Sequence, residues 1–333
     1  MAGNAKGFAV ANWASPTASN LYSVRMITAS DGWAVGSGGT IIRWNGTDWS
    51  VWPSPTTRRL LSVSLVSAID GWAVGDGGTV IRWNGTDWSK WTSPTAFQLS
   101  SVFMVSGNDG WAVGSGGTII RCNGTGWKSV KSPTTDSLWS VHMAGPDDGW
   151  AVGWGITIRW NGTDWSTWTT PTHIDLASVF MLNADDGWAV GLGAMVRWNG
   201  TTWNDVTSPT AEWLTSVFMV SANDGWAVTN VGMIFRWNGI SWSNCTSPTT
   251  ERLLSLSMVS DSSGWAVGYN GTVIHWTGTE WIPEFSTGIL MLLLTSFTLV
   301  SIILVRTVSR RGRAGARGCF STRLTDEGEK EGN

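Results

Sequence analysis

Six arginines stand at the same place in successive stretches of this sequence, and a histidine takes that place in a seventh stretch. A guanidinium group binds carboxylates through paired hydrogen bonds, so a cluster of arginines could hold an acidic substrate. An active site needs asymmetry, however, and these residues repeat along the chain. We therefore expect structural arginines, each pairing with an acid or capping the edge of a sheet. The residues are Arg43, Arg82, Arg121, Arg159, Arg197 and Arg236, followed by His275.

The other residue types that carry chemistry form no catalytic set. Tyr22 and Tyr269 are the only tyrosines, and the three cysteines lack Cys-x-x-Cys or Cys/His metal spacing. An aspartate precedes Gly-Trp in six stretches, and we interpret it as a turn residue that bonds nearby backbone N–H groups. With no nucleophile–base pair and no phosphate loop, the sequence predicts a protein without catalytic residues, metal or cofactor. These aspartates are Asp31, Asp70, Asp109, Asp148, Asp186 and Asp224.

The tetrapeptide Gly-Trp-Ala-Val recurs seven times and sets the organisation of the chain. Its tryptophans are separated by 39, 39, 39, 38, 38 and 39 residues. A period of about 40 residues with strand-like patterning is typical of a β-propeller, in which each repeat forms one blade. No helical periodicity accompanies the repeat. The tryptophans are Trp33, Trp72, Trp111, Trp150, Trp188, Trp226 and Trp265.

The second repeat shows how each blade is built. Residues 60–66 alternate apolar and small polar side chains, 72–74 form a short apolar run, 79–83 are rich in β-branched residues, and 88–91 follow. Between the last two segments, Asn84-Gly85 predicts a type I′ hairpin turn, with positive φ at both residues. The sequence therefore predicts an all-β, seven-bladed propeller of four-stranded antiparallel blades.

The two ends of the repeat array suggest how the propeller closes. In full repeats a tryptophan often lies three residues before a proline, as in Trp52 and Pro55, and the N-terminus carries the same pair as Trp13 and Pro16. The last repeat lacks this piece. We expect residues 8–17 to supply or complete the outer strand of the final blade, which would cover open sheet edges. The alternative is that the N-terminus is a fragment of an upstream repeat.

The composition limits the classes of partner. Charged residues make up 14% of the chain and the net charge is −3, so no basic field indicates nucleic-acid binding. The 27 tryptophans and 41 glycines suit tight turns and wide gaps between blades. Most indoles are expected in the core, and an exposed subset could stack on carbohydrate.

The repeat resembles the photosystem II stability/assembly-factor-like and BNR (sialidase Asp-box) group of propellers. The resemblance rests on DGWAVG at residues 31–36 and WNGTDW at residues 44–49, and it covers about residues 13–282. It implies the fold, since the group serves many functions. Asn45-Gly46 with Trp49 stands where that group has its Asp-box. Sialidases of the group would need an asymmetric arginine cluster, a tyrosine nucleophile and an acid/base carboxylate.

The composition changes abruptly after residue 282. Gly288 to Val305 contains no charge over 18 residues, which predicts a transmembrane α-helix. Five arginines follow directly, so the positive-inside rule predicts a cytoplasmic C-terminus and an extracellular propeller. We expect three parts: the propeller at 1–282, a linker and transmembrane helix at 283–305, and a basic, then acidic cytoplasmic tail at 306–333. The arginines are Arg306, Arg310, Arg311, Arg313 and Arg317.

Pro283-Glu284-Phe285, the apolar span and the arginines together resemble the PEF-CTERM sorting signal of archaeal surface proteins. That resemblance implies processing by an archaeosortase at the cell membrane, and the alternative is an uncleaved helix. Residues 1–8 show no export signal, so we expect a start further upstream. A tail anchor with a cytoplasmic propeller would contradict the charge rule.

Asparagines in Asn-x-Ser/Thr sequences fit an extracellular location, although the turn alone also explains most of them. The glycosylation candidates are Asn45, Asn84, Asn123, Asn161, Asn199, Asn244 and Asn270. Ligand-binding candidates are residues that break the repeat, Trp154, Trp213 and Tyr269, together with breaks at His142 and His173. Three functions remain open: a surface binding or scaffold module for proteins or glycans, an assembly factor for a membrane complex, and a sialidase-like glycoside hydrolase.

Overall fold

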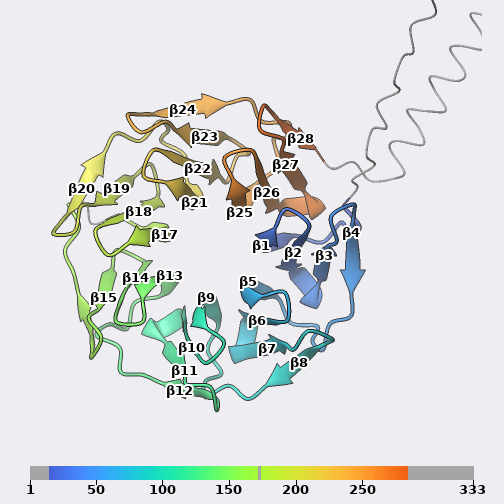
Figure 1. Ribbon diagram of the computed structural model, residues 1–333. Helices are drawn as coiled ribbons and strands as arrows, with labels where there is room; N and C mark the ends of the chain where they lie inside the picture. Colours follow the sequence, from blue (N-terminus) through green and yellow to red (C-terminus); the bar gives the residue numbers. More distant parts are fainter. Residues whose placement is uncertain (1–14, 172–173, 284–333) are drawn as a thin grey trace, which may run out of the picture. The chain divides into compact units, whose positions relative to one another are not determined.

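Seven four-stranded antiparallel sheets stand around a central axis as the blades of a propeller (Figure 1). The computed structural model describes residues 15–171 and 174–283. Each sheet is formed by four strands that follow one another in the sequence, from the central axis outward. The predicted all-β propeller, its seven blades and their four antiparallel strands are confirmed.

The strands of each position have nearly the same length in every blade. The innermost strands are β1 (Leu21–Thr28), β5 (Leu60–Ser67), β9 (Leu99–Ser106), β13 (Leu138–Gly145), β17 (Leu176–Asn183), β21 (Leu214–Ser221) and β25 (Leu253–Ser260). The second strands are β2 (Asp31–Gly36), β6 (Asp70–Gly75), β10 (Asp109–Gly114), β14 (Asp148–Gly153), β18 (Asp186–Gly191), β22 (Asp224–Thr229) and β26 (Ser263–Gly268).

The outer half of each blade is shorter. The third strands are β3 (Ile41–Trp44), β7 (Thr79–Trp83), β11 (Ile119–Cys122), β15 (Thr157–Trp160), β19 (Met195–Trp198), β23 (Ile234–Trp237) and β27 (Val273–Trp276). The outermost strands are β4 (Trp49–Trp52), β8 (Trp88–Trp91), β12 (Trp127–Ser129), β16 (Trp165–Thr167), β20 (Trp203–Val206), β24 (Trp242–Cys245) and β28 (Trp281–Pro283). Single 3₁₀ turns follow four second strands: η1 (Ser37–Gly39), η2 (Asp76–Gly78), η3 (Ser115–Gly117) and η4 (Tyr269–Gly271).

Tryptophans fill the gaps between blades, as the composition predicts. Trp33 of the first blade is fully buried, and its indole packs against Trp83 at 4.7 Å and Trp88 at 5.5 Å in the second blade. Equivalent clusters occur between the other blades, for example Trp226 against Trp276 at 4.6 Å. Because both faces of every blade are covered by neighbours, the Trp-Ala-Val segment can be apolar throughout.

The Asn-Gly loops differ from the predicted type I′ turn. In the first blade β3 and β4 are joined by four residues, and Trp44 pairs with Trp49. Gly46 has φ +96°, whereas Asn45 is not among the residues with positive φ. The Asn45 side-chain oxygen instead accepts hydrogen bonds from the backbone N–H groups of Thr47 and Asp48. The prediction was wrong because the asparagine stabilises the loop through its side chain rather than through a left-handed backbone.

A circle of serine hydrogen bonds joins the seven innermost strands. The hydroxyl oxygen of Ser23 in β1 accepts the backbone N–H of Val63 in β5 at 3.2 Å. Ser255 in β25 accepts the N–H of Val24 in β1, so the same bond joins the last blade to the first. All seven bonds measure 3.1–3.4 Å, and the serines are Ser23, Ser62, Ser101, Ser140, Ser178, Ser216 and Ser255.

The N-terminal segment meets the seventh blade where the propeller closes. A side chain at Gly271 would collide with the carbonyl of Thr17, as one at Gly39 would collide with the carbonyl of Thr56. Ser15-Pro16-Thr17 thus occupies the place that Ser-Pro-Thr segments take between consecutive blades. Among the described residues the fourth strand of the seventh sheet is its own β28, and residues 15–17 are not in a strand. The closing strand expected from residues 8–14 lies outside the described residues.

The predictions for the C-terminal part also lie outside the described residues. They concern the membrane helix Gly288–Val305, the sorting signal from residue 284 onward and the tail at 306–333. Within residues 15–171 and 174–283 there is no helix with the length and apolarity needed to span a bilayer.

Candidate functional site

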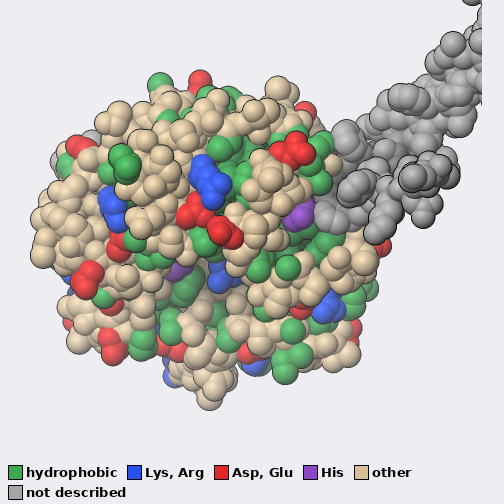
Figure 2. Space-filling view, turned by 45° about the horizontal axis from the view of Figure 1, so that its top comes forward, with side chains coloured by type: hydrophobic (Ala, Val, Ile, Leu, Met, Phe, Trp, Pro, Cys, Tyr) green, Lys and Arg blue, Asp and Glu red, His purple; other side chains and the backbone are tan. Residues whose placement is uncertain are grey.

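The two ends of the propeller are built from different connections. We call the end with the β1–β2 type turns and the Asn-Gly loops the hairpin face. The opposite end carries the 3₁₀ turns and the Ser-Pro-Thr segments that join blades, and we call it the linker face. Charged side chains are sparse on the surface shown in Figure 2, where uncharged atoms predominate.

On the hairpin face the repeated arginines are bound in ion pairs. Arg43 donates its Nε–H to Asp31, and the five equivalent pairs have N–O distances of 2.8–3.1 Å. Each guanidinium also lies over the tryptophan of the adjacent second strand, 4.8–5.2 Å from the indole centroid. The expectation of structural arginines is confirmed. The aspartates, interpreted from sequence as turn residues bonding backbone N–H groups, instead hold these arginines.

The seventh blade breaks this pattern. Ser263 stands where the other blades have aspartate, and His275 replaces the arginine. The imidazole of His275 stacks on Trp265, with centroids 4.2 Å apart, and burial lowers its pKa to about 4. His275 is therefore neutral at physiological pH and covers the indole without carrying a charge.

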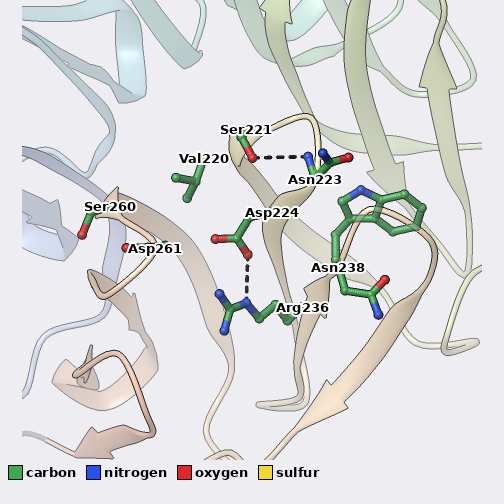
Figure 3. Close-up of a pocket in the computed structure, with 9 residues that line it drawn as sticks. Val220, Ser221, Asn223, Asp224, Arg236, Asn238, Ser260 and Asp261 are labelled. Atoms are coloured by element: carbon green, nitrogen blue, oxygen red, sulfur yellow. Dashed lines mark hydrogen bonds and ion pairs between the residues drawn. The ribbon is translucent and has the colours of Figure 1, made fainter.

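A hollow of about 700 Å³ lies beside this break, between the sixth and seventh blades (Figure 3). Asp224 and Arg236 form its centre, joined by a hydrogen bond of 2.8 Å, and Ser260 and Asp261 line the side of the seventh blade. A similar but smaller hollow of about 390 Å³ surrounds Asp70 and Arg82. We therefore interpret both hollows as consequences of the repeat rather than as a specialised site.

The geometry separates the groups that a sialidase would bring together. The paired arginines lie on the hairpin face, whereas Tyr269 lies in η4 on the linker face. The Tyr269 ring packs under the Arg252 guanidinium at 5.2 Å. Among the described residues no group of three or more His, Cys, Asp or Glu side chains could hold a metal ion.

On the linker face, apolar side chains gather over the fourth, fifth and sixth blades. Trp139 and Trp213 lie 5.9 Å apart, and Trp213 forms a backbone bridge with Leu192. The backbone N–H of Trp154 bonds to Ser137, two residues before Trp139, and Trp154 is 66% exposed. We call Trp139, Trp154, Leu192, Trp213 and Val231 the apolar sector.

The opposite part of the linker face, over the seventh, first and second blades, is polar. Arg59 pairs with Asp76 at 2.6 Å, and Asn270 donates a hydrogen bond to Glu251. Tyr22 accepts a hydrogen bond from Ser37. Although partial burial acts to raise it, the pKa of Tyr22 is lowered by hydrogen bonds with Ser37, Asn20 and Arg59.

We call the region around the axis, enclosed by the seven innermost strands, the central channel. Its end on the linker face is a hollow of about 430 Å³, which we call the vestibule. Tyr22 and Trp139 stand on its wall, and all seven serines of the hydrogen-bonded circle line it. Because each of these serine oxygens accepts a backbone N–H, its own O–H remains available to a ligand. No hydrogen bond donated by these hydroxyls is present among the described residues.

The next layer of the channel, two residues further along each innermost strand, differs strongly from blade to blade. The rings of Phe103, His142, Phe180 and Phe218 follow one another with centroids 4.2–4.7 Å apart. The other three positions hold Ser257, Arg25 and Ser64, as the strand registers show. One arc of this layer is thus aromatic and the other is polar.

His142 accepts the backbone N–H of Met181 at its Nδ1. Burial and the nearby charge of Arg25 lower its pKa to about 3. His142 is therefore neutral, and its Nε2 carries the proton.

The residues predicted as ligand-binding all lie on the linker face, but the structure does not bring the three together. Trp154 and Trp213 belong to the apolar sector, and Tyr269 belongs to the polar part. The sequence singled out His142 without its neighbours, and it missed Arg25 and Trp139. A comparison of the seven innermost strands at one position would have shown that Arg25, His142 and three phenylalanines share a layer. His173 lies outside the described residues.

All seven glycosylation candidates have exposed side chains. Asn45, Asn84, Asn123, Asn161 and Asn199 lie in the Asn-Gly loops, Asn244 in β24, and Asn270 in η4 with φ +55°. In the loops the asparagine oxygen is already bonded within its turn, as in Asn199 with Thr201. Whether they carry sugar stays a prediction.

Neither a protein-family model nor a curated protein matches the chain. Among solved structures, it is similar to YCF48 bound to a D1 peptide, with a TM-score of 0.67, 17% identity, and coverage of 82% of this chain and 99% of that one. It is also similar to YCF48 from Cyanidioschyzon merolae, with a TM-score of 0.64, 19% identity, and coverage of 78% and 96%. The chain is also similar to the WD40 repeats of RRP9, with a TM-score of 0.64, 12% identity, and coverage of 75% of this chain and 88% of that one. These similarities are at the level of the propeller fold.

Proposed function

We propose that the chain is a binding module that holds a partner protein against the apolar sector of its linker face. The observation that carries the proposal is the contiguous set of apolar side chains over three consecutive blades. At the place of Trp154 and Leu192, the first three blades have Ser37, Asp76 and Ser115. Exposed, clustered apolar side chains on one face are typical of protein interaction sites.

Two further considerations support this proposal. The structurally similar YCF48 was solved with a bound peptide, so a propeller of this shape can hold a polypeptide segment. In addition, Trp139 and Trp213 are half-buried and held by neighbouring loops, so a partner would meet rigid aromatic side chains at little entropic cost.

In the cell, we infer, the propeller is extracellular and is attached to the membrane through Gly288–Val305. The uncharged span and the arginines that follow it support this orientation. The partner would then be another surface or membrane protein, which includes the role of an assembly factor for a membrane complex.

The test compares two kinds of surface change in the full-length chain. Trp154→Ser combined with Leu192→Ser removes the two most exposed side chains of the apolar sector. Ile240→Ser is the matched control, because Ile240 is 86% exposed on the hairpin face. Cross-linking in native membranes, followed by purification and mass spectrometry, should recover a defined partner with the wild type and the control but not with the double variant.

Two outcomes would contradict the proposal. One is retention of the partner by the double variant, and the other is equal loss in Ile240→Ser. Binding to glycans that depends on Trp154, without a protein partner, would assign the same surface to carbohydrate instead.

A further inference from the structure

Arg25 is a cation inside the channel that the protein itself does not neutralise. Among the described residues its guanidinium has no hydrogen-bond or ion-pair partner. None of the seven innermost strands contains an aspartate or a glutamate. Burial lowers the pKa of Arg25, and its charge contributes to the lowered pKa of His142 across the channel.

Arg25 is partly buried, and a partly buried cation without a protein counter-charge favours the binding of an anion. A bound anion would supply the counter-charge that the innermost strands lack. The groups around it suit an anion: Ser64 and Ser257 flank Arg25 in the same layer, and seven serine hydroxyls line the vestibule above. Successive side chains on one side of a strand are about 7 Å apart, so both layers lie within reach of one small ligand.

The opposite arc of the same layer adds a second requirement. Phe103, Phe180 and Phe218 are apolar, and the neutral His142 packs between two of them. A bare inorganic ion would leave these faces without a contact, whereas a flat organic acid would place its charge on Arg25 and its body against the rings.

We propose that the central channel is a binding site for a small organic carboxylate with a flat apolar body, with Arg25 and the serine hydroxyls holding its carboxylate. The ligand enters through the vestibule on the linker face. This site is separate from the apolar sector, so it does not depend on the proposed protein partner and can fail or succeed independently of it.

Calorimetric titration of the full-length chain, purified in a non-ionic detergent, tests the proposal with benzoate as the probe. Benzamide has the same shape without the charge, and inorganic phosphate has the charge without the ring. We expect both to bind at least tenfold more weakly than benzoate. Arg25→Ser, which introduces the residue of the neighbouring blades, should weaken benzoate binding at least tenfold, and Arg58→Ser on the linker face should leave it unchanged.

A second measurement compares melting temperatures, first without and then with benzoate. Because Arg25 lacks a counter-charge, Arg25→Ser should raise the melting temperature of the ligand-free chain, and benzoate should narrow this difference by stabilising the wild type. Equal benzoate affinity of the wild type and Arg25→Ser would overturn the proposal. Phosphate binding as tightly as benzoate would also overturn it, as would a lowered melting temperature of ligand-free Arg25→Ser.

Discussion

The two faces of the propeller are made by the same seven repeats, yet one is nearly uniform and the other varies. On the hairpin face six blades repeat one arrangement of aspartate, arginine and tryptophan. On the linker face the residue that follows the second strand is serine, aspartate, tryptophan, leucine, asparagine or tyrosine, depending on the blade. The repeated side chains hold neighbouring blades together, whereas the variable ones lie around the channel mouth, where a ligand can meet them. Variation between repeats is therefore a better guide to function here than the repeated motifs.

The largest expected effect comes from the tryptophans that every blade shares. Trp226→Ala should lower the free energy of unfolding by about 3–5 kcal/mol, because the indole is fully buried against Trp276 and Trp281. Trp154→Ala, on the variable face, should change it by less than about 0.5 kcal/mol. Urea unfolding followed by circular dichroism measures both, and similar losses would contradict the division between structural and exposed tryptophans.

The next effect concerns the channel layer and depends on pH. The pKa of His142 is about 3 in the fold and about 6.5 in an unfolded chain. Below pH 6.5 the unfolded chain takes up a proton that the folded chain does not, so stability falls as the pH decreases toward 3. His142→Phe, which introduces the residue of three other blades, should reduce the loss of stability between pH 7 and pH 4.5 by about 2–3 kcal/mol.

Melting temperatures of the wild type and His142→Phe across this pH range check the prediction. The acid sensitivity that remains in the variant should include a contribution from His275, whose pKa is about 4. Parallel curves for the two proteins would show that His142 titrates normally in the fold.

The smallest effect compares ion pairs on the two faces. Asp186→Asn weakens a pair whose arginine also covers Trp188, and we expect a loss of about 0.5–1 kcal/mol. Asp76→Asn on the linker face breaks the pair with Arg59. Among the described residues Arg59 contacts no indole, so this change should lower the free energy of unfolding by less than Asp186→Asn does. A larger loss for Asp76→Asn in thermal unfolding would contradict the structural role assigned to the hairpin face.

The sequence predicted the fold because its evidence is local and repeated. The seven copies of the repeat indicated the number of blades, and the strands expected at 60–66 and 88–91 agree with β5 and β8. The prediction of a type I′ turn was wrong because the Asn84 side chain accepts hydrogen bonds from the backbone of its own loop. The Asn-Gly pair alone does not indicate this role.

The candidate site was predicted only in part. Three residues stood out because each interrupts the repeated pattern of its own loop: Trp154, Trp213 and Tyr269. Arg25 and Trp139 lie next to residues of other blades, about 40 to 230 positions away in the sequence. Only the closed propeller shows which strand positions face the channel.

The circle of serine bonds has a consequence for how the chain could be rearranged. Ser255 and Val24 form the same bond across the junction of last and first blade that the other serines form between consecutive blades. The described structure therefore has no preferred starting blade. If Pro283 were linked to Ser15 by a short connector, new termini in any Ser-Pro-Thr segment should give a circularly permuted propeller with the same channel.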